Sequence, residues 1–344
     1  MPNLVNKRGW FYILSLVLVL PGLLAILFGG LRFGIDFTGG SSWDLYFKSN
    51  IPSSAQVENT IKVAEEGYLA LLRTKANRTD AEKSLLTQRD QQAFTALASP
   101  SEGGLIILRT SEISGQTDEK QTLINAIKAA YPTFDEGRNS VYTVGSVVAS
   151  EIGVRTLFAI VLISIATLAY LAWSFRNVKN PLRYATCTVL AMFYNVLLLL
   201  GIFGILGAFF RVEIDALFIT ALLTVVGFSN HDTIVVFDRI RENELRNPGE
   251  QFDSVVNYSL LQTLARSINT NLTIIFPLIA LYLFGGESIR TFVLALMIGM
   301  ISVTYSSIFN ASMFLVSWTK NDFGKYLGRN NQSSKRPTTP ATAR

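Results

Sequence analysis

The sequence predicts a polytopic α-helical membrane protein, with six transmembrane helices and a small α+β, ferredoxin-like external domain between the first two. Of the 344 residues, 49% are hydrophobic and only 16% are charged, so the chain is more apolar than an ordinary soluble domain. Six apolar runs come close to or exceed the ~17 to 25 residues that cross a bilayer core. The predicted spans are 10–30, 151–174, 182–207, 214–237, 265–285 and 290–318.

The basic residues predict the orientation of these helices. They precede the first run, join the second to the third, and follow the fourth and the sixth. If each run crosses once, all of them lie on one side, which the positive-inside rule identifies as the cytoplasm. Residues 1–9, the loop 238–264 and the basic tail 319–344 are then cytoplasmic, and residues 31–150 form the external, periplasmic domain. The tail cannot bury a core, so we expect it to be disordered.

The first run has a second interpretation as a cleaved signal peptide, because Lys7 and Arg8 precede it. Its apolar stretch exceeds the ~7 to 15 residues of a signal core, and Phe28-Gly29-Gly30 is a poor cleavage site. We therefore expect a retained helix.

The external segment begins with strand-forming and helix-forming residues. Ile35–Phe47 is rich in aromatic and β-branched residues, which predicts a strand bent at Gly39 and Gly40. Ser53 and Gln56 have the spacing of a capping box, which predicts that a helix begins there.

The rest of this domain is less regular in sequence. Residues 73–103 are polar and are interpreted as an insertion with a lone helix around Ala81–Leu97. Short strands are expected at Leu105–Arg109 and Ser140–Val144, on either side of a helix closed by Pro132. This order suggests a ferredoxin-like sandwich with one strand that the sequence does not place.

The fourth apolar run carries an acidic residue near its middle. His231, the single histidine of the chain, precedes Asp232 there, and Ser229 and Thr233 share a helical face with the aspartate. A carboxylate in lipid costs several kcal/mol unless it is paired or hydrated, so such a residue marks an ion or proton pathway. We expect this face to point into the helix bundle.

The fifth run carries a second polar stripe. Thr263, Arg266, Thr270 and Thr273 are spaced by three or four residues, so they could face Asp232 across the bundle. An Asp–Arg pair that forms and separates would take up and release a proton. The arginine could instead only extend to the cytoplasmic headgroups. In the third run, Gly201, Gly204 and Gly207 are predicted to permit close contact between helices.

The composition argues against several other classes of protein. The net charge is +5, but the basic residues lie in short loops and not on one soluble surface, so we expect no nucleic-acid partner. With one histidine and one cysteine, Cys187, the chain has few ligands for a zinc site and few residues for a catalytic triad. We therefore expect no enzyme activity, no metal and no cofactor.

Three segments together resemble the bacterial protein-export SecF family. They are FGIDFTGGSSWDLYF after the first helix, GFSNHDTIVVFDRIREN in the fourth, and QTLARSINTNL through IRTFVLALMIGMISVTYSSIFNAS in the last two. The resemblance implies a resistance-nodulation-division type of bundle in the bacterial inner membrane, partnered by the related subunit SecD. It also implies that the proton-motive force is used to promote late stages of preprotein export through the SecYEG translocon, with SecA involved indirectly.

Several residues are carried over from this resemblance by position. Asp232 matches the family's membrane aspartate, and Arg266 matches the arginine that opens the fifth helix. The residue before the aspartate is usually asparagine in the family, whereas here it is His231, which could add a second titratable group. The motif at the foot of the external domain is matched by Gly34, Asp36, Phe37, Gly39 and Gly40.

The two polar stripes themselves suggest the hypothesis that protonation of Asp232 frees Arg266, so that the helices shift and the external domain moves with the first helix. Two other functions remain open. A proton-coupled exporter of small molecules or lipids from the same superfamily would share the intramembrane carboxylate, and a passive scaffold would move no ion. The choice between H⁺ and Na⁺ as the coupling ion also stays open.

Overall fold

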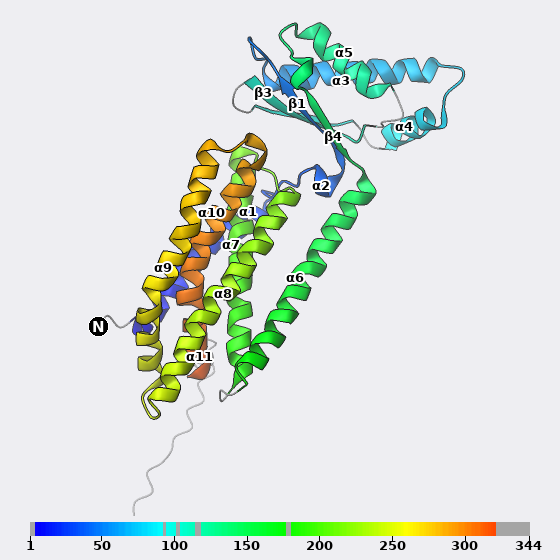
Figure 1. The fold of residues 1–344 in the computed structure, drawn as a ribbon. Coiled ribbons are helices and arrows are strands. Elements are labelled where there is room, and N and C mark those ends of the chain that lie inside the picture. The colour runs from blue at the N-terminus through cyan, green and yellow to red at the C-terminus, as the bar shows by residue number, and fades with distance from the viewer. Residues whose placement is uncertain (1–3, 92–93, 101–103, 114–117, 177–179, 321–344) are drawn as a thin grey trace, which may run out of the picture.

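The computed structural model describes residues 4–91, 94–100, 104–113, 118–176 and 180–320. A bundle of long helices carries a small mixed domain at one end (Figure 1). Within the described residues, six helical spans are long and apolar enough to cross a membrane, which confirms the predicted fold class. Most of the tail predicted at 319–344 lies outside the described residues.

The six spans are built from eight helical elements. The first is α1 (Arg8–Leu27), which the short turn η1 (Val5–Lys7) precedes. The next four are α6 (Ser146–Ser174), α7 (Pro181–Phe210), α8 (Ala216–Arg246) and α9 (Phe252–Phe284). The last span joins α10 (Glu287–Tyr305), the π-helical turn η4 (Ser306–Asn310) and α11 (Ala311–Thr319).

Helices α8 and α9 continue through most of the segment expected to be the loop 238–264, so that expectation is wrong. The polar residues there pair across the helical hairpin, because Asn243 Nδ2 donates to Ser259 Oγ at 2.8 Å and both side chains are buried. These contacts stabilise helix beyond the apolar run, where hydropathy gives no signal.

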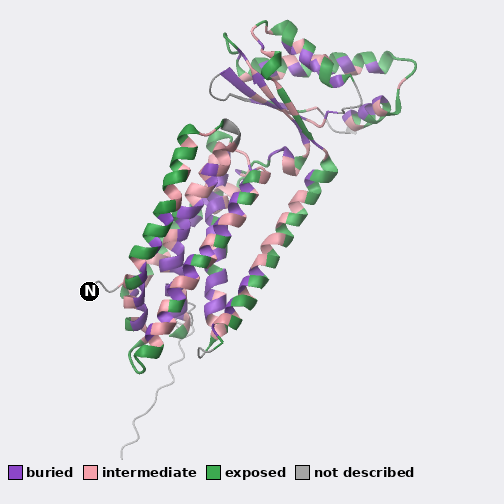
Figure 2. Ribbon diagram, viewed as in Figure 1, coloured by how far each residue is buried: buried purple, intermediate pink, exposed green. Residues whose placement is uncertain are grey.

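Buried residues concentrate on α7, α8 and the α10–α11 span, whereas α6 exposes most of its length (Figure 2). Glycines allow α1 and α7 to approach closely. A Cβ atom built on Gly201 would lie 2.9 Å from Cα of Gly22, and one built on Gly30 would lie 2.5 Å from the carbonyl oxygen of Gly204. The predicted close helix contact in the third span is therefore confirmed.

The external domain is a four-stranded antiparallel sheet with strand order β2-β3-β1-β4. Trp43 at its centre pairs with Leu108 on one side and Val141 on the other. Helices α3 and α5 lie on one side of the sheet (Figure 1), and the core lies between the layers. The elements are β1 (Gly40–Tyr46), α3 (Ser54–Thr74), α4 (Asp80–Gln91), β2 (Ala96–Pro100), β3 (Leu105–Thr110), α5 (Glu119–Ala130) and β4 (Ser140–Val144).

The strand that the sequence did not place is β2. It lies inside the segment 73–103, so the interpretation of that whole segment as an insertion is wrong. Ala98 pairs with Leu108 in the sheet, and the extra element is α4 alone. The segment Ala96–Pro100 reads ALASP, which lacks the β-branched and aromatic residues that mark strands, so it gave no signal. With β2 in place, the order is that of a ferredoxin-like fold.

The beginning of the domain also differs from the prediction. A short helix, α2 (Ile35–Thr38), replaces the first part of the expected strand. Gly39 and Gly40 follow with φ of 73° and 130°, values that favour glycine, and β1 starts only at Gly40. The capping box of Ser53 and Gln56 is present as predicted.

Candidate functional site

Asp232 lies in the interior of the bundle, near the middle of α8. Its side chain is buried, with 4% of its surface exposed. Nδ2 of Asn271 on α9 donates to Asp232 Oδ2 at 2.8 Å and also contacts the Ser267 carbonyl at 3.0 Å. Asn271 is itself 2% exposed. The carboxylate is therefore held by a neutral amide in a place that apolar helices surround.

The prediction that the stripe with Arg266 faces Asp232 is wrong. Arg266 and Thr270 lie on the exposed side of α9. The inward stripe consists of buried polar residues spaced by four, namely Ser259, Thr263, Ser267 and Asn271. Only Thr263 belongs to both stripes. The spacing of this second stripe is as regular in the sequence as that of the first, so spacing alone does not show that Asn271 faces inward.

The inward orientation predicted for Ser229 and Thr233 is present. Both are fully buried, and Asn195 Nδ2 on α7 donates to Ser229 Oγ at 2.8 Å. Ser302 and Ser306 each donate to Asn195 Oδ1 at 2.7 Å. One amide thus connects α7 and α8 with the α10–η4 segment one helical turn from Asp232. Asn195 was not predicted, since a lone amide in an apolar run gives no spacing signal.

His231 lies on a different face of α8 from its neighbour. It is exposed, whereas Asp232 is buried, because successive helical residues differ by about 100° in direction. The histidine therefore does not line the interior site in this structure.

The glycine motif joins the external domain to the start of α8. The Gly34 N–H donates to the Ile214 carbonyl at 2.8 Å. The Asp36 carboxylate accepts two hydrogen bonds, from the Ala216 N–H at 2.8 Å and from the Tyr142 hydroxyl of β4 at 3.1 Å. Asp36 therefore connects an edge strand of the domain with the first residue of the helix that carries Asp232.

The other motif residues fix the path of the chain at this junction. Phe37 packs against the apolar core of the bundle. A Cβ atom on Gly40 would lie 2.6 Å from the Thr110 carbonyl oxygen, so a larger residue would displace the sheet. Arg109 of β3 forms an ion pair with Glu213, just before α8. Arg109 and Glu213 line a cavity of about 510 Å³ below the sheet.

The described part of the chain contains no group of three His, Cys, Asp or Glu residues that could hold a metal ion. The site consists of one buried carboxylate, Asp232, and its neutral partner Asn271. Helix α8 connects this carboxylate to the external domain. A buried carboxylate can bind a proton or another cation, and binding would change the charge on α8.

Comparison with known proteins identifies the family. The family model for the C-terminal region of the protein export membrane proteins SecD and SecF matches residues 124–321. The protein translocase subunit SecF of Thermobaculum terrenum is 47% identical, over 96% of this chain and 98% of that protein. SecF of Anaerolinea thermophila is 34% identical with the same coverage.

A solved structure agrees. The crystal structure of SecDF from Thermus thermophilus, described as a translocon-associated membrane protein, has a TM-score of 0.71 at 26% identity over 93% of this chain. This chain spans 39% of the length of that one. The chain therefore belongs to the SecF family, the multi-pass bacterial inner-membrane proteins that serve as auxiliary, non-enzymatic subunits of the Sec protein translocase.

Proposed function

We propose that this subunit uses the proton-motive force to promote late stages of preprotein export through SecYEG, by coupling the protonation of Asp232 to movement of its external domain. It acts together with SecD and without hydrolytic chemistry of its own, and SecA takes part only indirectly.

The main support for this proposal is that one helix, α8, carries Asp232 and is contacted at its first residue by a second carboxylate, that of Asp36 on α2. Asp36 holds the N–H of Ala216, the first residue of α8, and Asp232 lies sixteen residues later on the same helix, about 24 Å away at 1.5 Å per residue. A shift or rotation of α8 is therefore transmitted directly to the base of the external domain. This connection runs through α8 and differs from the route through the first helix that the sequence suggested.

The partner of Asp232 suits a group that changes its charge. An amide has donors and an acceptor, so Asn271 can donate to the ionised carboxylate and, after rotation of its amide, accept from the protonated one. Asn271 can therefore hydrogen-bond the carboxyl group in both of its charge states. The ion that the arrangement best supports is therefore the proton.

The exposed polar residues of α9 support an interface with SecD. Arg266 and Thr270 are exposed on α9, and an arginine on the surface of a membrane helix needs either a partner or access to the headgroups. We assign this face of α9 to contact with the SecD bundle, where Arg266 supplies a positive charge to the proton pathway.

The test is preprotein export into inverted membrane vesicles that contain the complete translocase, with and without an imposed potential and pH gradient. Asp232→Asn should remove the stimulation by the gradient while complex assembly stays normal. The matched control is Asp238→Asn on the same helix, where an exposed aspartate pairs with Arg241; it should retain the stimulation. Full stimulation in the Asp232→Asn vesicles would favour a passive scaffold and refute the proposal.

A further inference from the structure

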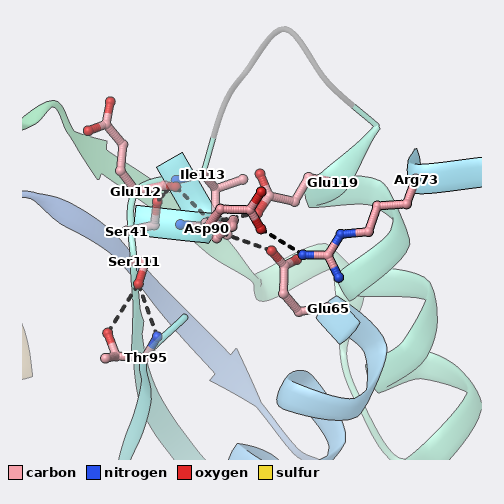
Figure 3. A network of polar contacts seen from close by, with 10 residues as sticks. Ser41, Glu65, Arg73, Asp90, Thr95, Ser111, Glu112, Ile113 and Glu119 are labelled. Atoms are coloured by element: carbon pink, nitrogen blue, oxygen red, sulfur yellow. Dashed lines mark hydrogen bonds and ion pairs between the residues drawn. The ribbon is translucent and has the colours of Figure 1, made fainter. Parts of the chain in front are cut away.

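A buried cluster of three charged side chains lies in the external domain, where α3, α4 and α5 meet. Arg89 of α4 donates through Nε to Glu65 Oε1 on α3 at 3.0 Å, and through Nη2 to Glu119 Oε1 on α5 at 2.7 Å. The exposed fractions of these side chains are 2%, 1% and 0%. Figure 3 shows that the side chains of Glu65 and Glu119 point toward each other from their two helices. The proposed export function makes no use of this cluster.

The charges of the cluster do not balance. Two carboxylates and one guanidinium leave a net negative charge, which is costly in a buried site. Glu65 Oε2 is buried and accepts no hydrogen bond from any described residue, while Oε1 of each carboxylate accepts a hydrogen bond from the same guanidinium. A single proton between the two carboxylates would supply the missing donor and make the cluster neutral. We place this proton on Glu65, because its Oε2 is the buried oxygen that lacks a donor.

The electrostatic surroundings agree with this assignment. Burial and the nearby Glu119 carboxylate raise the pKa of Glu65 to about 7, although Arg89 opposes the shift. The chain's single histidine lies in α8, so no imidazole in the external domain titrates in this range.

The other charged groups around the cluster point elsewhere. Arg73 of α3 and Asp90 of α4 pair with each other on the exposed surface. Glu112 follows β3, and only its backbone carbonyl contacts the cluster, where it accepts a hydrogen bond from Arg89 Nη2 at 3.0 Å. The carboxylate of Glu112 accepts a hydrogen bond from the N–H of Ser146 instead. The strands of the sheet contribute apolar side chains to this core.

We propose that Glu65, Arg89 and Glu119 form a proton-dependent latch that holds α4 on the external domain. While the carboxylates share a proton, the cluster is neutral and α4 is docked. Loss of that proton leaves a buried net charge, which is relieved when α4 separates and water enters. The remaining attachments of α4 are the apolar contact of Leu85 and Leu86 with α3 and two ion pairs, Arg73–Asp90 and Lys75–Glu82.

Release of α4 would change the base of the domain. Gln88, the residue before Arg89, lines the cavity of about 510 Å³ that also includes Gly39, Gly40 and Arg109. Docked α4 therefore forms one wall of a cavity next to the junction with α8. The latch closes this wall at acidic external pH and opens it at alkaline pH.

The sign and size of the effect follow from proton linkage. Glu65 has a pKa of about 7 when docked and an ordinary value of 4.5 when exposed to water, so the docked state binds more protons between these values. Docking is therefore strongest below pH 4.5 and weakens as the pH rises through 7. The ratio of docked to released α4 should fall about 30-fold between pH 5.5 and 8.5.

Hydrogen–deuterium exchange of the full-length protein in nanodiscs tests the latch. Protection of the amides of α4, corrected for the chemical exchange rate, should fall about 30-fold between pH 5.5 and 8.5. In Glu65→Gln, the amide can still accept from Arg89 and donate to Glu119 but cannot titrate, so the protection should become independent of pH. Asp90→Asn, next to Arg89 on the exposed side of α4, should retain the transition.

If the protection of the α4 amides in the unmodified protein changes by less than about threefold between pH 5.5 and 8.5, the proposal is wrong. An unaltered transition in Glu65→Gln would also overturn it, because the titration would then belong to another group. If Glu65→Gln does not fold, the pH series of the unmodified protein decides together with Glu119→Gln. A flat series, or an unchanged transition in Glu119→Gln, refutes the latch, and loss of the transition in Glu119→Gln supports it.

Discussion

Replacing Gly201 by alanine tests the close contact between α1 and α7. The new Cβ would lie 2.9 Å from Cα and 3.2 Å from the carbonyl carbon of Gly22. Because both are backbone atoms, neither can rotate away, and the helices must separate by roughly 1 Å to reach normal contact. Overpacking of this kind costs about 1–3 kcal/mol, against a gain in helix propensity of about 1 kcal/mol. We expect a net loss of about 1 kcal/mol, and at most about 2 kcal/mol, in the free energy of unfolding.

Gly227→Ala is the matched control, because Gly227 is also a helical glycine and no described atom lies within 4 Å of its added Cβ. This variant should gain about 0.5–1 kcal/mol from helix propensity. The assay is reversible unfolding of the full-length protein in mixed micelles. We expect Gly201→Ala to lower the free energy of unfolding and Gly227→Ala to raise it. If Gly201→Ala is as stable as Gly227→Ala, the close contact of α1 and α7 is not present in the membrane.

Four further predictions concern single contacts. Asn271→Leu leaves the Asp232 carboxylate without its donor; it should destabilise the protein by about 1–3 kcal/mol and abolish gradient-stimulated export in vesicles. Arg266→Gln should reduce co-purification with SecD, while the melting temperature of the isolated subunit stays unchanged. Tyr142→Phe removes one of the two hydrogen bonds to Asp36, so gradient-stimulated export should fall less than in Asp36→Asn. Ser53→Ala removes the cap of α3 and should destabilise the external domain by about 1 kcal/mol, measured by thermal unfolding.

Local signals in the sequence predicted much of the fold. Apolar runs marked the six spans, and the spacing of Ser53 and Gln56 marked the start of α3. The burial of Asp232 with Ser229 and Thr233 also followed from spacing, since one polar face on an apolar helix has a single favourable orientation. In each case the residues within one short stretch of chain were sufficient for the prediction.

The rest depended on contacts between distant segments. Helix α9 has polar residues on two faces, and spacing alone could not show that Asn271, and not Arg266, faces Asp232. The strand β2 forms because β3 offers it an edge, while its own residues show no preference for a strand. The link from Asp36 to Ala216 joins residues 180 positions apart. Such pairings are decided by packing, to which local propensity is only a weak guide.

We propose that a change in the charge of Asp232 moves the external domain through α8. Fluorescence labels at Lys120 of α5 and Phe210 at the end of α7, both exposed, would report the distance between the domain and the bundle in proteoliposomes that contain the complex with SecD. A proton gradient should change energy transfer between the labels in the unmodified subunit and in Asp238→Asn, but not in Asp232→Asn. An equal change in the Asp232→Asn protein would contradict the account.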